Sequence, residues 1–227
     1  MNTLPADTRN FLGKIVQFYN PVRVGEIVGR GTMGVVYSTE NPRKVVKVVS
    51  PERFPNEYQT YKTAAKIGVG ARIYGWTLVH DSPAIIMERF PTMFDYTDGS
   101  DENCSALCNL IVKVCYSGWF CADFHGKNIM WDVRGNLRLI DPTLMKTVEF
   151  VSKYLPDPIT AMSKAKLRSI GMGLMIDYIT HPLFGGVRLD RNPNFAKHFV
   201  ELLDGCFVMN SHCGVWELGT YVPRGGK

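Results

Sequence analysis

Apolar and polar positions change their spacing several times along the chain, and each spacing predicts a different element. Near the start, five apolar side chains recur at helical intervals and predict that residues 1–20 form a short amphipathic helix: Phe11, Leu12, Ile15, Val16 and Tyr19. Residues 22–39 mix β-branched side chains with glycines, which predicts two strands joined by a glycine-rich bend. The valine-rich run at 43–50 predicts a third strand.

A helix and two more strands are predicted next. Residues 51–68 have proline near their start and glycine at their end, which are typical helix boundaries. Apolar runs at 71–79 and 83–90 predict the two further strands. The first 90 residues are therefore expected to be rich in strands.

The pattern changes after about residue 102. Residues 105–120 have the apolar spacing of a buried helix, and 128–141 predict two short strands around an Arg-Gly-Asn turn. Helices are predicted at 160–180 and 194–207. A β-rich part followed by an α-rich part predicts an α+β protein of two lobes, with the boundary near 91–101.

Composition narrows the class of protein. The 227 residues are 45% hydrophobic and carry a net charge of +5 without a long basic run, so no dedicated nucleic-acid surface is expected. No apolar segment is long enough to span a membrane, and the start does not resemble a signal peptide. The six cysteines lack paired C-x-x-C spacing, which favours reduced thiols in a cytoplasmic protein over disulfides or zinc.

Three glycines, Gly29, Gly31 and Gly34, form the motif G-x-G-x-x-G in the stretch GRGTMGVV. In a dinucleotide-binding fold this motif opens a helix. Here a predicted strand follows the motif, so a dinucleotide-binding fold is rejected. A glycine-rich hairpin lets backbone N–H groups approach phosphate oxygens. The alternative is a flexible surface hairpin without a ligand.

Lys47 stands within the valine-rich strand, where its charge would be costly to bury without an anion. Nucleotide phosphates and a helix carboxylate would satisfy it. Glu57, in the following predicted helix, is the best partner, and Glu52 is the fallback. Either glutamate is alternatively a solvated helix acid.

The stretch CADFHGKNIMW at 121–131 places polar side chains among large apolar residues. Asp123 and Asn128 are five positions apart, and Asp141 follows thirteen residues later. This spacing resembles that of protein kinases, in which the first aspartate accepts a hydroxyl proton. In that motif the asparagine and the second aspartate hold magnesium against phosphates. Each residue alone is more often a turn former, but the complete set behind a glycine loop and a strand lysine predicts a catalytic loop.

Together these segments resemble the eukaryotic-like protein kinase superfamily, from the glycine motif to about residue 145 and more loosely thereafter. DFHGKNIMW followed by LIDP is more specifically similar to minimal kinases among bacterial effectors and short-tailed phages. The resemblance implies one minimal kinase domain over 1–227. It would be a two-lobed protein-kinase-like fold with a β-rich small lobe at about 1–90 and a reduced α-helical large lobe at about 91–227.

The same resemblance implies a cofactor, a substrate and a role for each site residue. The cofactor is ATP with Mg²⁺, or alternatively Mn²⁺, and the acceptor is a protein, expected to be one of a host. Nine residues are implied in nucleotide binding: Gly29, Gly31, Gly34, Val36, Lys47, Glu57, Met87 as gatekeeper, and Glu88 and Phe90 through their backbones. The implied metal ligands are Asn128 and Asp141, and the implied catalytic residues are Asp123, Lys47, His125 and Lys127.

The chain also departs from the kinase pattern. Cys121 and Ala122 replace the histidine and arginine before the catalytic aspartate, so a phosphorylated activation loop would lack its usual receptor. Asp141 is followed by Pro142 and Thr143 instead of Phe-Gly, and only 86 of the 227 residues follow Asp141. We therefore expect a trimmed substrate-binding half and a kinase that is active as synthesised.

Two alternatives remain open. His125 makes the pattern D-x-H-x-x-N, which also occurs in aminoglycoside and choline phosphotransferases, although those usually carry a larger helical lobe. In this context Lys127 would neutralise phosphate charge. A pseudokinase that binds partners without catalysis would be expected to lack the lysine or a metal ligand, and none is lost here.

Overall fold

The computed structural model describes residues 4–32, 34–154, 164–180, 194, 197, 214–217 and 220–223. The chain divides into two compact units, Met1–Phe90 and Pro91–Lys227. It combines an antiparallel sheet with several helices, so the expected α+β class is confirmed. Among the described helices, none has both the length and the apolar character needed to cross a bilayer.

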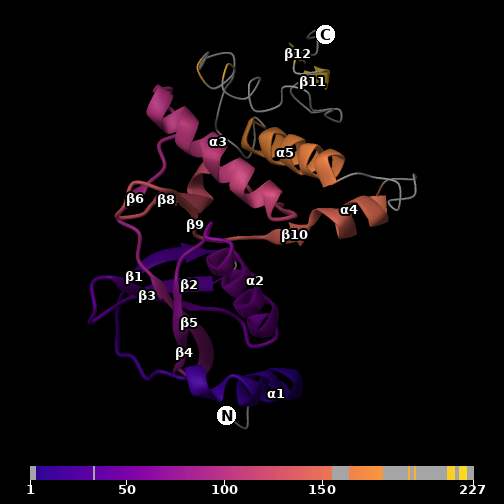
Figure 1. Ribbon diagram of the computed structural model, residues 1–227. Helices are drawn as coiled ribbons and strands as arrows, with labels where there is room; N and C mark the ends of the chain where they lie inside the picture. The colour runs from indigo at the N-terminus through magenta and orange to yellow at the C-terminus, as the bar shows by residue number, and fades with distance from the viewer. Residues whose placement is uncertain are drawn as a thin grey trace. The chain divides into compact units, whose positions relative to one another are not determined.

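The first unit is built on a five-stranded antiparallel sheet (Figure 1). Its spatial order is β1-β2-β3-β5-β4. The strands are β1 Val24–Gly31, β2 Gly34–Thr39, β3 Lys44–Val48, β4 Ile73–Val79 and β5 Ser82–Glu88. They confirm the five strands that the sequence predicts, with boundaries shifted by a few residues.

Helix α2, Phe54–Lys66, lies against one face of this sheet (Figure 1). Its buried residues recur every three or four positions: Phe54, Tyr58, Tyr61 and Ala64. Phe54 contacts the ring of Trp76 on β4 at a centroid distance of 6.3 Å. Burying one such aromatic side chain stabilises a fold by roughly 1.5–3 kcal/mol, so this stripe is what anchors the helix to the sheet.

The predicted helix at residues 1–20 is wrong in its length. Helix α1 covers Ala6–Lys14, and a 3₁₀ turn, η1, follows at Val16–Phe18. Just after the helix, the Ile15 carbonyl accepts from the Phe18 N–H of this turn and from the Trp76 indole Nε1–H, each at 2.9 Å. The expected apolar face is split, because Leu12 and Ile15 are buried whereas Val16 and Tyr19 are exposed.

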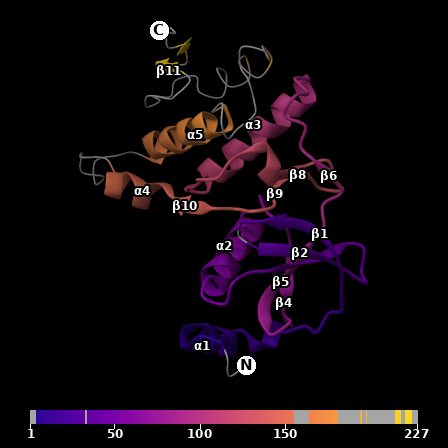
Figure 2. The ribbon, with the colours of Figure 1, turned by 180° about the vertical axis from the view of Figure 1, so that it is seen from behind.

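The second unit combines short strands with longer helices (Figure 2). Its elements are β6 Thr92–Met93, α3 Asp101–Tyr116, β7 Trp119–Cys121, the 3₁₀ turn η2 Gly126–Asn128, β8 Ile129–Trp131, β9 Leu137–Leu139, β10 Leu144–Lys146, α4 Thr147–Tyr154, α5 Lys164–Thr180, β11 Gly214–Glu217 and β12 Thr220–Pro223. Strands β6, β8 and β9 form one sheet, while β7 pairs with β10 and β11 with β12. Helices α3 and α5 pack side by side, with Cys115 Sγ 3.7 Å from Met175 Sδ.

The helix predicted at 105–120 begins and ends earlier than expected. The Ser100 side chain caps α3 by accepting the Asn103 N–H at 3.3 Å. The helix ends before Gly118, whose φ of +84° is the left-handed conformation that favours glycine. The apolar residues after it pair with β10 as strand β7 instead of continuing the helix.

The remaining predictions in this unit are confirmed in part. Strands β8 and β9 flank the predicted turn in 128–141, and α5 confirms the helix at 160–180 except for residues 160–163, which lie outside the described residues. The helix predicted at 194–207 falls outside them too, apart from residues 194 and 197. Sequence patterns miss β6, β10, α4 and the hairpin of β11 and β12.

Four of the six cysteines lie in the described part of the chain, where they are buried and form no disulfide: Cys104, Cys108, Cys115 and Cys121. Burial, followed by the charges of Asp101 and Asp98, raises the pKa of Cys104 to about 11. These four thiols agree with the expectation of reduced, mostly buried cysteines. Cys206 and Cys213 lie outside the described residues.

Candidate functional site

The glycine-rich hairpin of the first unit depends on Gly34. Gly31 pairs with Gly34 where β1 turns into β2. Gly34 has a φ of +157°, and a Cβ atom there would overlap the carbonyl oxygen of Val48 and lie 3.5 Å from Lys47 Cε. A side chain is excluded by β3 itself, so the hairpin backbone is held directly against the strand that carries Lys47.

A row of cross-strand neighbours connects this hairpin to Lys47. Gly29 on β1 is opposite Val36 on β2, and Val36 is opposite Lys47 on β3. Lys47 is in turn opposite Ile85 on β5. Directly opposed residues in antiparallel strands present their side chains on the same face. Val46, the neighbour of Lys47 on β3, points to the opposite face and belongs to the apolar cluster that also contains Ile86.

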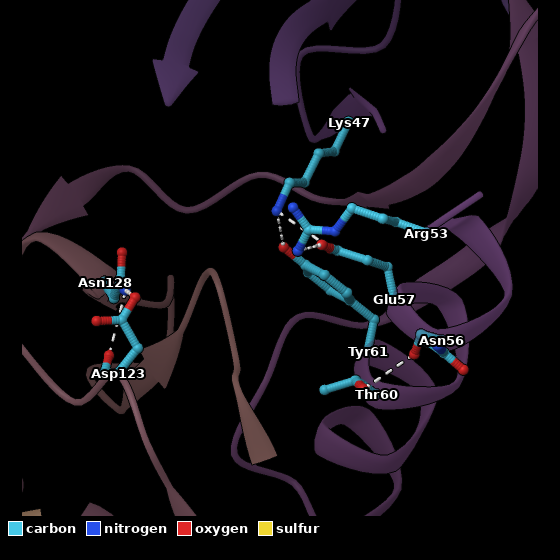
Figure 3. A network of polar contacts seen from close by, with 8 residues as sticks. All are labelled: Lys47, Arg53, Asn56, Glu57, Thr60, Tyr61, Asp123 and Asn128. Carbon is cyan, nitrogen blue, oxygen red and sulfur yellow. Dashed lines mark hydrogen bonds and ion pairs between the residues drawn. The ribbon is translucent and has the colours of Figure 1, made fainter. Parts of the chain in front are cut away.

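Lys47 is buried, with 6% of its side chain exposed, and it points at α2 (Figure 3). Its Nζ donates to the Tyr61 hydroxyl at 2.8 Å and lies 3.5 Å from Glu57 Oε2. Arg53 also binds Glu57, through Nη2 and Oε1 at 2.9 Å. The expected contact between Lys47 and Glu57 is therefore present, whereas the fallback, Glu52, is exposed.

The end of β5 carries the residues expected at the adenine. Met87 is buried and pairs with Val45, two positions before Lys47 and so on the same face. The Glu88 N–H is taken by the Arg72 carbonyl at 2.9 Å, so Glu88 would have to offer its carbonyl to a ligand. Phe90 is buried at the end of the first unit.

In the second unit, the stretch after β7 brings Asp123 and Asn128 together (Figure 3). Asn128 Nδ2 donates to the Asp123 carboxylate at 2.9 Å and to its backbone carbonyl at 3.2 Å. Both N–H groups of the amide are thereby used on Asp123. The amide oxygen accepts no hydrogen bond within the described part of the chain, and an oxygen in this state suits a hard cation.

Asp141 is held next to this loop by two backbone pairings. The Ile140 N–H donates to the Asn128 carbonyl at 2.9 Å, and the Ala122 N–H donates to the Thr143 carbonyl at 2.8 Å. The loop from 122 to 128 and the segment from 140 to 143 are thus tied at both ends. Burial raises the pKa of the Cys121 thiol to about 11, although hydrogen bonds with the backbone of Asp123 and Thr143 lower it. The charges of Asp123 and Asp141 add smaller increases in this pKa, which agrees with both carboxylates being near the thiol.

His125 and Lys127 differ in their surroundings. His125 Nε2 lies 3.4 Å from Asp123 Oδ1, while its Nδ1 is buried without a hydrogen-bond partner among the described residues. Lys127 is exposed on η2. His125 is thus in contact with the predicted catalytic carboxylate, and Lys127 is accessible to an anionic ligand.

Asn128 and Asp141 are the residues that could hold a metal. Within the described residues, no group of three or more His, Cys, Asp or Glu side chains could hold a metal ion by itself. Two oxygen-bearing side chains suit Mg²⁺, which usually keeps waters and shares phosphate oxygens instead of occupying an all-protein cage. The donor set therefore fits a metal that arrives with a nucleotide.

Sequence reasoning missed Tyr61 and Arg53 as members of the Lys47 cluster. Both are one helical turn from Glu57, and this i±4 spacing was the available signal. It also missed Asp132, whose carboxylate holds the turn between β8 and β9 by accepting from Arg138 Nε at 2.8 Å.

Comparison of the sequence with models of known protein families and with curated proteins found no match. The interpretation of the site therefore depends on the geometry of its residues.

Proposed function

We propose that this protein is an ATP-dependent phosphotransferase, most simply a minimal serine/threonine protein kinase with one two-lobed domain. The observation that carries the proposal is the buried contact between Lys47 and Glu57. Lys47 lies on β3, which pairs with strand β2 of the glycine-rich hairpin, and Glu57 lies on α2. A lysine on the third strand paired to a glutamate of the next helix is the arrangement by which protein kinases hold ATP phosphates.

Within the first unit, each element has a part in nucleotide binding. The hairpin through Gly34 supplies backbone N–H groups close to Lys47, and the Lys47 ammonium group supplies a cation for phosphate oxygens. The face around Met87 is apolar, as an adenine ring requires. These features support a nucleotide site on the face of the sheet that α2 covers.

Within the second unit, the loop residues have the groups that phosphoryl transfer needs. Asp123 would accept or orient the proton of the acceptor hydroxyl, and the Asn128 amide holds its carboxylate in place. Asn128 and Asp141 would hold Mg²⁺, which when bound neutralises phosphate charge. Lys127, which is exposed, would attract the remaining negative charge.

The acceptor is proposed to be a protein hydroxyl, in a cytoplasmic setting that includes a host cell. The 3.4 Å contact between His125 and Asp123 favours a second candidate, a small-molecule kinase of the aminoglycoside or choline type. The two differ only in the acceptor, because both use the same nucleotide and metal residues.

The test is transfer of labelled γ-phosphate from ATP, first to proteins of a lysate and then to aminoglycosides and choline. Asp123→Ala and Asp141→Ala should each abolish transfer while the protein stays folded by circular dichroism. Glu149→Gln, which removes an exposed carboxylate of the same unit, is the matched control and should keep full activity. More than a few per cent of residual activity in Asp141→Ala would sink the metal assignment.

A further inference from the structure

On helix α2, both Tyr61 and Glu57 contact the Lys47 ammonium group, and the uncharged Tyr61 is closer. The Tyr61 hydroxyl oxygen is 2.8 Å from Nζ, a full hydrogen bond, whereas Glu57 Oε2 is 3.5 Å away, at the limit of one. Figure 3 shows Lys47 extended toward the tip of Tyr61. Of these two groups, Tyr61 therefore makes the better-formed hydrogen bond to Nζ.

Glu57 is also shared with a second cation. Arg53 Nη2 binds the other carboxylate oxygen of Glu57 at 2.9 Å, across one turn of α2. Formal charges of Lys47, Arg53 and Glu57 therefore leave this trio one positive charge in excess. An uncharged hydroxyl orients the ammonium group without neutralising it.

Tyr61 is suited to fix a position because its side chain is buried. Its side chain is 1% exposed on the buried face of α2. Its ring centroid is 5.1 Å from Lys47 Nζ, so ring and hydroxyl both contact the cation. A buried tyrosine has two side-chain torsions to restrain, which makes its oxygen a more rigid partner than the carboxylate of a longer glutamate.

We propose that the Tyr61 hydroxyl, more than the Glu57 carboxylate, is the positioning group that aims Lys47 at the nucleotide phosphates. This inference rests on the proposed function, because it assumes that Lys47 binds phosphate. Tyr61 acts through Lys47 and does not itself contact the reacting atoms. The carboxylate of Glu57 is held mainly by Arg53 and contributes less.

The test removes the hydroxyl and keeps the ring. Tyr61→Phe should lower the affinity for Mg²⁺–ATP, measured by calorimetry, and kcat/KM for ATP by about ten-fold, as expected for a hydrogen bond to a charged group. KM for the phosphate acceptor should not change. Glu57→Gln should cost less than Tyr61→Phe.

The matched control is Tyr58→Phe, which removes a hydroxyl from the preceding turn of the same buried helix face. The cation over the Tyr58 ring is Lys62, at 5.8 Å from its centroid, so this change should leave ATP affinity as in the wild type. A Tyr61→Phe protein with wild-type affinity would overturn the proposal.

A double-mutant cycle separates positioning from general packing. In a Lys47→Met protein, Tyr61→Phe should have no further effect on ATP affinity, since its action requires the ammonium group. An equal loss in both backgrounds would refute positioning and leave Tyr61 as a packing residue.

The same four proteins are unfolded in urea without nucleotide, which makes the two kinds of failure distinguishable. Coupling between Lys47 and Tyr61 in unfolding, together with ATP binding that depends on Tyr61, supports the proposal. If unfolding shows coupling between Lys47 and Tyr61 but the wild-type protein binds no ATP, the proposed function is refuted, and with it the phosphate role of Tyr61. ATP binding without coupling would refute the role of Tyr61 alone.

Discussion

Gly34 offers a direct test of how the glycine hairpin is held against β3. In Gly34→Ala the new methyl group would overlap the Val48 carbonyl oxygen, a backbone atom that cannot rotate away. The backbone at Gly34 would also keep a φ of +157°, which alanine adopts with strain. The substitution should therefore push the β1–β2 hairpin off β3 at the position of Lys47.

The magnitude follows from these two effects. Overpacking against fixed neighbours typically costs about 1–3 kcal/mol, and an unfavourable φ adds roughly 1–2 kcal/mol. We expect Gly34→Ala to lower the free energy of unfolding by about 2–5 kcal/mol, less if the hairpin relaxes by opening locally. Opening would instead appear as a weaker affinity for ATP.

Gly31→Ala is the matched control, because a Cβ at Gly31 would meet nothing within 4 Å although Gly31 pairs directly with Gly34. Both changes lower the entropy of the unfolded chain equally, so their difference reports the native state. Urea unfolding of both variants and of the wild type measures the free energy, and calorimetry measures the ATP affinity. The reasoning is refuted if Gly34→Ala matches Gly31→Ala in both measurements.

Two further predictions concern titrating groups of the second unit. Burial alone would raise the pKa of Asp132, but hydrogen bonds from the Asn136 and Arg134 backbone and from Arg138 outweigh it and lower this pKa. Asp132 should therefore stabilise the fold fully above its unfolded pKa of about 3.9 and lose that contribution as the pH falls through the lower folded value. Asp132→Asn should cost about 1–3 kcal/mol in urea unfolding at pH 7, and a cost that failed to shrink toward pH 3 would contradict this sign. Because burial raises the pKa of Cys121 to about 11, iodoacetamide at pH 8 should modify this thiol only after unfolding. Mass spectrometry measures the modification, and rapid labelling of the native protein would show that the thiol is not buried.

Most elements could be predicted because their signals are local. The valine-rich strand around Lys47 and the buried stripe of α2 follow from side-chain spacing alone. The predictions from sequence were wrong where a short apolar run is compatible with both a helix and a strand. Residues 119–121 have the same apolar character in a helix or a strand, and pairing with β10 is what makes them a strand.

The candidate site divides in the same way. The spacing of Asp123, Asn128 and Asp141 can be read directly from the chain, as can the presence of a charged lysine among valines. The sequence also indicates Glu57 as the partner of Lys47, with Glu52 as the fallback. It does not indicate Tyr61, because one turn of helix presents several polar side chains toward a neighbouring strand.

The sequence by itself determined the order of the elements in the first unit and the chemical types in the site, since periodicity and spacing are properties of neighbouring residues. The tertiary structure decided which polar atoms meet. Lys47 and Tyr61 are fourteen positions apart and come within 2.8 Å only because α2 packs its aromatic stripe on the sheet. Asp141 is held beside the loop only because the backbone groups of Ile140 and Ala122 pair across it. Such contacts depend on the rotation of a helix and the register of strands, which are set by burial of the whole core and not by any local run of residues.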